Sequence, residues 1–465
     1  MKKSKLVPCL ISSSFTFTSS SSSSSGISFI ACFLHNTKVM TVLDWGYRAN
    51  IKVHQAGDDH SANLKLKDNN GTVKFSQFIK QDLKFLDPSK KLYLNPYLFN
   101  GSLQTLYYTS MDSSNKFMIY YGRELFTYKD NGICSLDWVI PKPKNPEQFK
   151  RLQKETMPEG FPRLHPRCRY FDKEELSQLH EENLENTKPV VAILHGLAGG
   201  SHESLIRNFA EQINKNTKDW DVVVINSRGC ARTKITNGKL FTAGSTDDIR
   251  EVLQTFKQRW PKRPIYLVGF SFGAALTSNF LAEEGEKENP TNLVKAACTI
   301  CCPWDFVDGA HHLQESWTGK YLLSPALAKF LTKLVTNNYK ELNKYIPDII
   351  NENTLKTIEN SKSLWEFDDN VTCKTTPYNS AFEYYKELSP VNKIDHIKTP
   401  LLALNSTDDP AVGVKLPISQ MKSNPYFCLV ETDLGGHLGY IQQNGEFWCV
   451  ELAEQFFQKF EELIE

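Results

Sequence analysis

The sequence lacks any long uninterrupted apolar run. Although 40% of its 465 residues are hydrophobic, no stretch approaches the roughly 20 apolar residues that a helix needs to cross a bilayer. An integral membrane protein is therefore disfavoured, and a soluble or peripheral protein is expected.

An excess of charge of one sign is also lacking. The chain has 54 Lys and Arg residues against 53 Asp and Glu residues, which gives a net charge near +1. This balance offers no electrostatic reason to expect nucleic acid as a partner, and it suits neutral or lipophilic substrates better.

The 11 cysteines lack the regular pair spacing of a disulfide framework or a zinc site. Their odd number and scatter favour a reducing intracellular compartment. Cys298 and Cys301 form a CxxC match, which is open to a redox interpretation. We favour small buried strand residues instead, because the surrounding run from Ala296 to Pro303 is mostly apolar. No metal ion or bound cofactor is expected.

Residues 1–39 are unusual in composition. They contain early lysines and a serine tract, Ser19 to Ser25, and no acid precedes Asp44. This composition is typical of a targeting segment such as a transit peptide. A disordered extension fits equally well, because the tract has too few apolar residues to build a core. An intracellular location is expected, with association with mitochondria or lipid droplets left open.

Short apolar runs bounded by turn residues mark the main body. Runs that are apolar on both faces are typical of parallel strands covered by helices. The strands expected are 190–194, 222–225, 265–268, 296–302, 401–405 and 427–431. Helical patterns lie between the first three strands, at 205–213 and 246–256, and a closing helix is expected at 446–463. This alternation predicts a doubly wound α/β fold with a mostly parallel sheet.

These patterns divide the chain into parts. Residues 188–305 and 396–465 form the α/β core, and residues 306–395, more than a crossover helix needs, form a helical cap. Residues 40–187, rich in aromatic and strand-forming residues, form an N-terminal extension packed on the core. In the cap, a helix begins at Ser324, and its apolar stripe is expected to pack in a core rather than to touch lipid. The stripe consists of Leu327, Phe330, Leu331, Leu334 and Val335.

The sharpest local motif is Gly269-Phe270-Ser271-Phe272-Gly273. It follows an apolar strand and opens a helical run, which is the setting of a nucleophile elbow. A hydroxyl needs a strained turn to project from the top of a sheet, and the glycines leave room for that turn. Ser271 is therefore the predicted nucleophile.

Serine needs a base to take its proton, and the base needs a carboxylate to hold its tautomer. In this type of fold the order along the chain is serine, acid, histidine. His437, within Gly435-Gly436-His437, follows the last predicted strand and is the predicted base. Asp409 is the predicted acid because Pro410 fixes its turn, while the adjacent Asp408 and the earlier Asp305 stay open as alternatives.

A tetrahedral intermediate needs two backbone N–H donors in an oxyanion hole. We assign one to Phe272, the residue after the nucleophile, and the other to Leu197 in the glycine-rich loop His195-Gly196-Leu197-Ala198-Gly199-Gly200. His195 is expected to brace this loop rather than to act as a base. Arg228 is expected to pin loops, with contact to an anionic substrate group as the alternative.

The motifs HGLAGG, NSRGCARTK, GFSFG, NSTDDP and DLGGH occur in this order. With them the chain resembles the AB hydrolase 4 family of the α/β-hydrolase superfamily, and within it the fungal medium-chain fatty acid ethyl ester synthase/esterases. The resemblance runs from about Asp44 to the end and includes Asn95-Pro96-Tyr97-Leu98-Phe99. It implies an α/β-hydrolase fold with Ser271, Asp409 and His437 as charge-relay residues.

The resemblance further implies acyl transfer from medium-chain acyl-CoA to ethanol and hydrolysis of the resulting fatty acid esters. One acyl-Ser271 intermediate serves both reactions, and the alcohol or water that reaches it decides the product. A monoacylglycerol lipase is the alternative activity. A scaffold that binds a lipid or protein partner without catalysis is the alternative of another class, and peripheral binding to a lipid surface stays open.

Overall fold

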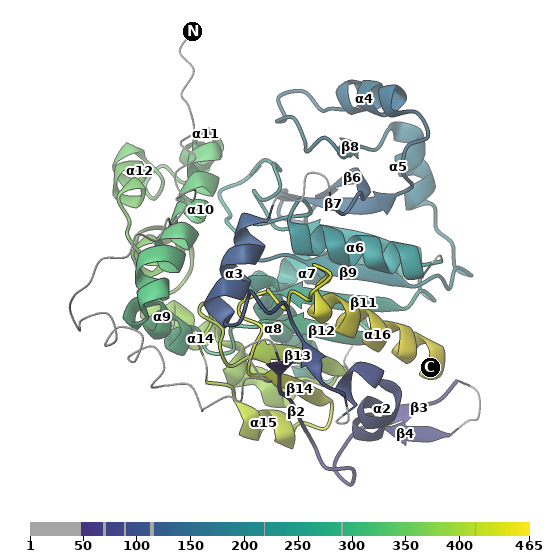
Figure 1. Ribbon diagram of the computed structural model, residues 1–465. Coiled ribbons are helices and arrows are strands. Elements are labelled where there is room, and N and C mark those ends of the chain that lie inside the picture. The colour runs from purple at the N-terminus through teal and green to yellow at the C-terminus, as the bar shows by residue number, and fades with distance from the viewer. Residues whose placement is uncertain are drawn as a thin grey trace, which may run out of the picture. The chain divides into compact units, whose positions relative to one another are not determined.

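The computed structural model describes residues 48–67, 71–87, 90–111, 116–217, 219–289, 292–413 and 415–465 (Figure 1). The segment 1–39, for which a targeting or disordered role is predicted, lies outside these residues. The strands of the main sheet are β2 (Ile51–Gln55), β6 (Tyr120–Thr127), β7 (Ile133–Ile140), β8 (Cys168–Tyr170), β9 (Val190–Leu194), β10 (Asp221–Asn226), β11 (Ile265–Phe270), β12 (Ala296–Ile300), β13 (Leu401–Ser406) and β14 (Phe427–Thr432). Their order across the sheet is β2-β14-β13-β12-β11-β9-β10-β7-β6-β8.

The centre of this sheet is parallel, as predicted. The six neighbouring strands β14, β13, β12, β11, β9 and β10 are parallel to one another. At the two sides of this group, β2 pairs with β14 and β7 pairs with β10, both in antiparallel register. The predicted strands are confirmed with small shifts of their ends. The strand predicted for 296–302 ends at Ile300, because Cys301 takes a positive φ of 53° that an extended strand cannot continue.

Strands from the N-terminal segment extend the sheet at both edges. It contributes β2 at one end and β7, β6 and β8 at the other, and the extension predicted for residues 40–187 therefore shares the sheet of the core. Small sheets join β1 (Arg48–Ala49) to β5 (Leu92–Tyr93) and β3 (Asn63–Lys65) to β4 (Thr72–Lys74). The helices of this segment are α2 (Phe75–Asp82), η2 (Lys84–Leu86), α3 (Gly101–Ser110), α4 (Pro146–Glu155) and α5 (Lys173–His180).

Helices cover both faces of the sheet. On one face lie α6 (Ser204–Asn216) and α16 (Trp448–Leu463), and on the other lie α7 (Thr246–Arg259) and α8 (Phe272–Glu286) (Figure 1). Successive strand residues point to opposite faces. Accordingly Val191 and Ile193 share a core with α6 and α16, whereas Ala192 and Leu194 pack with α7 and α8.

A helical segment joins β12 to β13, where the cap is predicted. Its elements are α9 (Phe306–Glu315), η3 (Gly319–Leu323), α10 (Ser324–Asn337), α11 (Tyr339–Tyr345), α12 (Glu352–Glu359), α13 (Leu364–Phe367), η4 (Asp368–Thr372), η5 (Cys373–Thr375), α14 (Ala381–Leu388) and η6 (Pro390–His396), and α15 (Ile418–Ser423) follows between β13 and β14. In α10, Leu331, Leu334 and Val335 are buried as predicted. The expectation is wrong for Phe330, which is 54% exposed at a cavity described below. None of the helices in the described part of the chain is long and apolar enough to span a bilayer.

Candidate active site

Ser271 lies in a sharp turn between β11 and α8. Its φ of 53° and ψ of −117° are strained for a residue with a side chain, a conformation that costs about 1–3 kcal/mol and persists only where its surroundings impose it. Two glycines make the turn possible. A Cβ on Gly269 would lie 2.3 Å from the Gly273 carbonyl oxygen, and one on Gly273 would lie 2.4 Å from the Leu194 oxygen.

The structure brings Ser271, His437 and Asp409 together. The Ser271 Oγ lies 2.7 Å from His437 Nε2, and His437 Nδ1 lies 2.8 Å from Asp409 Oδ2. The Asp409 side chain is buried, and its other oxygen accepts hydrogen bonds from the backbone N–H groups of Ala411 at 2.8 Å and Val412 at 3.2 Å. A carboxylate held in this way can fix the tautomer of the imidazole beside it.

The two alternative carboxylates have other contacts. Asp408 Oδ1 accepts from the Ser406 hydroxyl at 2.5 Å and from the Gly436 N–H at 2.9 Å, so it holds the histidine loop rather than the imidazole. Asp305 accepts from the N–H groups of Val307 and Asp308, which makes it the N-cap of α9.

The glycine-rich loop after β9 runs close to the nucleophile. A Cβ on Gly196 would lie 3.6 Å from the Ser271 Cβ, and Leu197 and Phe272 line the same cavity as Ser271. Among the hydrogen bonds between described residues, none uses the backbone N–H of Leu197 or of Phe272. Both groups predicted for the oxyanion hole thus remain free to donate to a ligand.

The predicted structural roles of His195 and Arg228 are confirmed. His195 Nε2 accepts from the Ser227 N–H at 3.1 Å, which ties the loop after β9 to the loop after β10, and burial lowers the pKa of His195 to about 4. Arg228 donates to both oxygens of Asp248 at 2.7 and 2.8 Å, and its guanidinium lies over the Tyr128 ring. The three cysteines at 298, 301 and 302 are free and buried, as favoured above.

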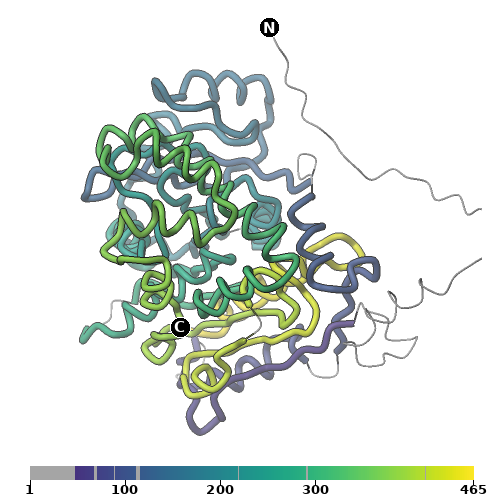
Figure 2. The backbone as a smooth tube through the Cα atoms, turned by 90° about the vertical axis from the view of Figure 1, so that its left-hand side faces the viewer, coloured from purple at the N-terminus to yellow at the C-terminus, as the bar shows by residue number. Residues whose placement is uncertain are grey.

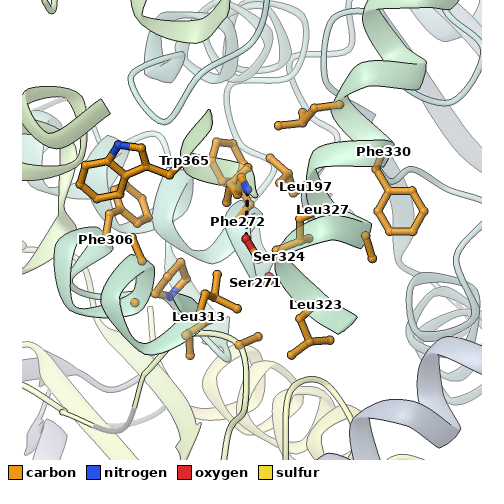
Figure 3. Close-up of a pocket in the computed structure, with 18 of the residues that line it drawn as sticks. Leu197, Ser271, Phe272, Phe306, Leu313, Leu323, Ser324, Leu327, Phe330 and Trp365 are labelled. Carbon is orange, nitrogen blue, oxygen red and sulfur yellow. Dashed lines mark hydrogen bonds between the residues drawn. The ribbon is translucent and has the colours of Figure 1, made fainter. Parts of the chain in front are cut away.

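An apolar cavity of about 330 Å³ opens above Ser271. Figure 3 shows Ser271 among Leu197, Phe272, Phe306, Leu313 and Leu327. These side chains come from the loop after β9, the start of α8 and the helices α9 and α10. The cavity can therefore take an acyl chain or another lipophilic group next to the hydroxyl.

Two carboxyl groups with raised pKa values were not predicted, one in the wall of this cavity and one beside the glycine-rich loop. Burial raises the pKa of Asp368, which lines the cavity, to about 6, and its oxygens accept from the Thr372 and Tyr385 hydroxyls at 2.5 Å each. Burial also raises the pKa of Glu203 to about 7, and a Cβ on Gly199 would lie 2.2 Å from the Glu203 Oε1. Neither residue stands in a recognisable motif, so the sequence gives no signal for them.

Comparison with known proteins agrees with this geometry. The family model for the alpha/beta hydrolase fold matches residues 189–442, more than half of the chain. The chain belongs to the alpha/beta hydrolase family. The predicted fold class and family are thereby confirmed, and the match spans the β strands and loops that carry Ser271, Asp409 and His437.

This hydrolase is 41% identical over 447 residues to the medium-chain fatty acid ethyl ester synthase/esterase 2 of Saccharomyces cerevisiae, covering 90% of this chain and 97% of that protein. It is 34% identical to the monoacylglycerol lipase of the same yeast, covering 79% of this chain and 80% of the lipase. A solved esterase of Pyrococcus furiosus aligns with a TM-score of 0.40 and 15% identity, over 75% of this chain and 96% of that one. The prediction that this hydrolase is an enzyme agrees with the names of the two yeast relatives.

Proposed function

We propose that this hydrolase is a serine esterase and alcohol O-acyltransferase that forms medium-chain fatty acid ethyl esters from acyl-CoA and ethanol and hydrolyses such esters. The observation that carries the proposal is the 2.7 Å hydrogen bond between Ser271 Oγ and His437 Nε2 beside an apolar cavity. Such a hydroxyl can be deprotonated by the imidazole as it attacks an acyl carbonyl.

The mechanism has two halves. Ser271 Oγ forms a bond to the acyl carbonyl carbon while its proton passes to His437 Nε2, and the leaving thiol or alcohol departs with that proton. Ethanol or water then attacks the acyl-Ser271 carbonyl, gives its proton to His437, and releases the ester or the acid as the proton returns to Ser271. Asp409 keeps the imidazole oriented and stabilises its charged form.

The backbone N–H groups of Leu197 and Phe272 are the proposed oxyanion donors. Both residues line the cavity beside Ser271, and Phe272 begins a helix whose N-terminus favours negative charge. Loss of one such donor typically costs on the order of a hundredfold or more in rate.

The size and lining of the cavity support a single medium-length acyl chain. Its volume of about 330 Å³ lies near the lower end of small-molecule sites, which range over roughly 300–1,000 Å³. The name of the yeast relative at 41% identity supports the same substrate class. Residues 306–395 act in this proposal as the cap over the 188–305 and 396–465 core, because α9, η3, α10, α13, η4 and α14 together supply most of the cavity wall.

A monoacylglycerol lipase is the second candidate. The Asp368 carboxyl and the Tyr385 hydroxyl form a polar spot in the mostly apolar cavity wall, and such groups suit the free hydroxyls of a glycerol ester. The 34% identical yeast lipase supports this candidate as well. Peripheral binding at a lipid surface fits either activity, because Trp317, Tyr321 and Phe330 are each more than half exposed.

Product analysis separates the candidates. The full chain is incubated with octanoyl-CoA and ethanol, with octanoyl-CoA alone, and with monooctanoylglycerol, and the same is done with Ser271→Ala. Ethyl octanoate in the first reaction supports the synthase, while preferential release of glycerol supports the lipase. A chain that is not labelled at Ser271 by a fluorophosphonate probe and forms no product would be the non-catalytic scaffold.

A further inference from the structure

The loop that carries His437 is held by three side chains from three separate parts of the chain. The backbone N–H of Gly436 donates to Asp408 Oδ1 at 2.9 Å, that of His437 to Thr105 Oγ1 at 2.8 Å, and that of Leu438 to Cys301 Sγ at 3.2 Å. Gly436 and Leu438 both have a φ of 61°. These three acceptors hold the loop together with its own hydrogen bond from the Tyr440 N–H to the Gly435 carbonyl at 3.0 Å.

Thr105 is the acceptor that touches the histidine itself, and it comes from the N-terminal segment. Its hydroxyl donates to the Gly101 carbonyl one turn earlier at 2.7 Å, so the oxygen lone pairs are left to accept the His437 N–H. Thr105 is buried at the edge of the cavity above Ser271. The Gly101 carbonyl and the His437 N–H together fix the orientation of the Thr105 side chain.

The rest of α3 is fitted to the same loop. A Cβ on Gly436 would lie 2.2 Å from the Gly101 carbonyl oxygen, and Gln104 Oε1 accepts from the Ile441 N–H at 2.8 Å. Figures 1 and 2 both show α3, in blue, beside the yellow loop that precedes α16. Helix α3 therefore contacts the loop on both sides of His437.

We propose that Thr105 is a positioning residue of the active site, through which helix α3 of the N-terminal segment fixes the height and orientation of the His437 imidazole above Ser271. The proposal rests on the proposed hydrolase function. A shift of about 1 Å in a reacting group can reduce a rate on the order of a hundredfold, so a lost backbone anchor next to the base affects turnover more than substrate binding.

The test compares three variants of the full chain with a medium-chain ester as substrate. Thr105→Val keeps the shape and removes the acceptor, and we expect kcat to fall roughly tenfold with KM within about twofold of wild type. Thr105→Ser restores the acceptor and is expected to recover most of kcat. Ser110→Ala is the matched control, because the Ser110 hydroxyl also bonds to a carbonyl of its own helix, that of Tyr107, and among the described residues it makes no hydrogen bond to the histidine loop.

Two further measurements separate positioning from a general loss of structure. Titration of Ser271 with a fluorophosphonate counts intact sites, and kcat per site is expected to remain low in Thr105→Val. The same titration on Thr105→Ser is the second measurement, and its kcat per site is expected to return close to the wild-type value. If Thr105→Val does not fold, Thr105→Ala, which introduces no added bulk, takes its place.

The proposal is overturned if kcat per site is unchanged in Thr105→Val, or if Thr105→Ser fails to recover it. Ser271→Ala is measured alongside. If Ser271→Ala retains activity, the proposed function itself fails, whereas loss of activity in Ser271→Ala with a normal Thr105→Val overturns the positioning role alone.

Discussion

Two buried carboxylates, Asp409 and Asp137, each stand in a cluster that contains a serine, yet the clusters differ in what lies between the partners. Asp409 reaches Ser271 through the imidazole of His437. Asp137, on β7, accepts directly from the Ser201 hydroxyl at 2.5 Å. A buried carboxylate near a serine therefore does not by itself mark a reactive site.

The surroundings of Asp137 explain its different role. Arg123 donates to both of its oxygens at 2.6 and 2.7 Å, and Asn226 donates at 3.0 Å. Burial alone would raise the pKa of Asp137, but Arg123 and these hydrogen bonds hold the pKa below its usual value. Ser201 is buried, whereas Ser271 lies at the cavity. A reactive serine requires a base such as an imidazole between the carboxylate and the hydroxyl, and a cavity through which substrate can reach the hydroxyl.

Replacing the two serines should produce opposite effects, and this is the largest difference we expect. Ser271→Ala should lower kcat on the order of a millionfold, because the acyl-enzyme cannot form, with little change in unfolding free energy. Ser201→Ala should keep kcat per folded molecule but lose about 1–3 kcal/mol of stability, since a buried acceptor loses its donor. Ester hydrolysis and urea unfolding measure the two quantities, and similar kinetic losses in both variants would contradict the comparison.

The adjacent carboxylates at 408 and 409 give the next largest contrast. Asp409→Asn should lower kcat roughly ten-thousandfold, because the amide favours the wrong imidazole tautomer. Asp408→Asn should cost about tenfold, because Asp408 accepts from the Gly436 N–H of the loop and not from the imidazole ring. Equal losses, measured as kcat at pH 8, would mean that the acid has been assigned to the wrong residue.

Local patterns account for what the sequence could predict. The strands 190–194 and 265–268 are apolar on both faces, and the turn at Ser271 needs glycines on either side. Both features can therefore be recognised from residues that are close together in the sequence. The Asp409 and His437 positions follow from their places after strands in a known order. These predictions needed no knowledge of long-range packing.

The remainder depends on contacts between distant segments. Nothing near Thr105 shows that its hydroxyl meets the His437 backbone 332 residues later. The edge strands β2 and β8 carry polar residues, and β8 has only three residues. Their hydrophobic pattern therefore does not predict a place in the main sheet, which depends on hydrogen bonding to the neighbouring strands. The predicted end of β12 was wrong for a related reason, since Cys301 leaves the strand with a positive φ and its sulfur accepts from a backbone N–H 137 residues later.

Breaking the Asp137 cluster tests its structural side. Asp137→Ala leaves the Arg123 guanidinium buried without its counter-charge, and we expect a loss of about 3–5 kcal/mol in the free energy of unfolding. The double variant Arg123→Met with Asp137→Leu should recover much of that loss, because it removes both charges. Urea unfolding monitored by tryptophan fluorescence measures both, and the exposed pair Lys150 and Glu147 offers a control, with no measurable change expected for Glu147→Gln.

A third buried carboxyl, Asp368, extends the comparison to a site without a cation. Its folded pKa of about 6 lies above the value of roughly 4 expected in the unfolded chain, so the folded state binds its proton more tightly. The associated stability, up to about 3 kcal/mol, is fully present below pH 4 and is lost as the pH rises through 6. Wild type should therefore lose stability between about pH 4 and pH 7 relative to Asp368→Asn, whose side chain stays neutral. The difference between the two curves removes the contribution of other groups such as Glu203. Parallel curves of unfolding free energy against pH would show that Asp368 is held ionised like Asp137. The contrast between buried carboxyls with and without a neighbouring cation would then not extend to the cavity wall.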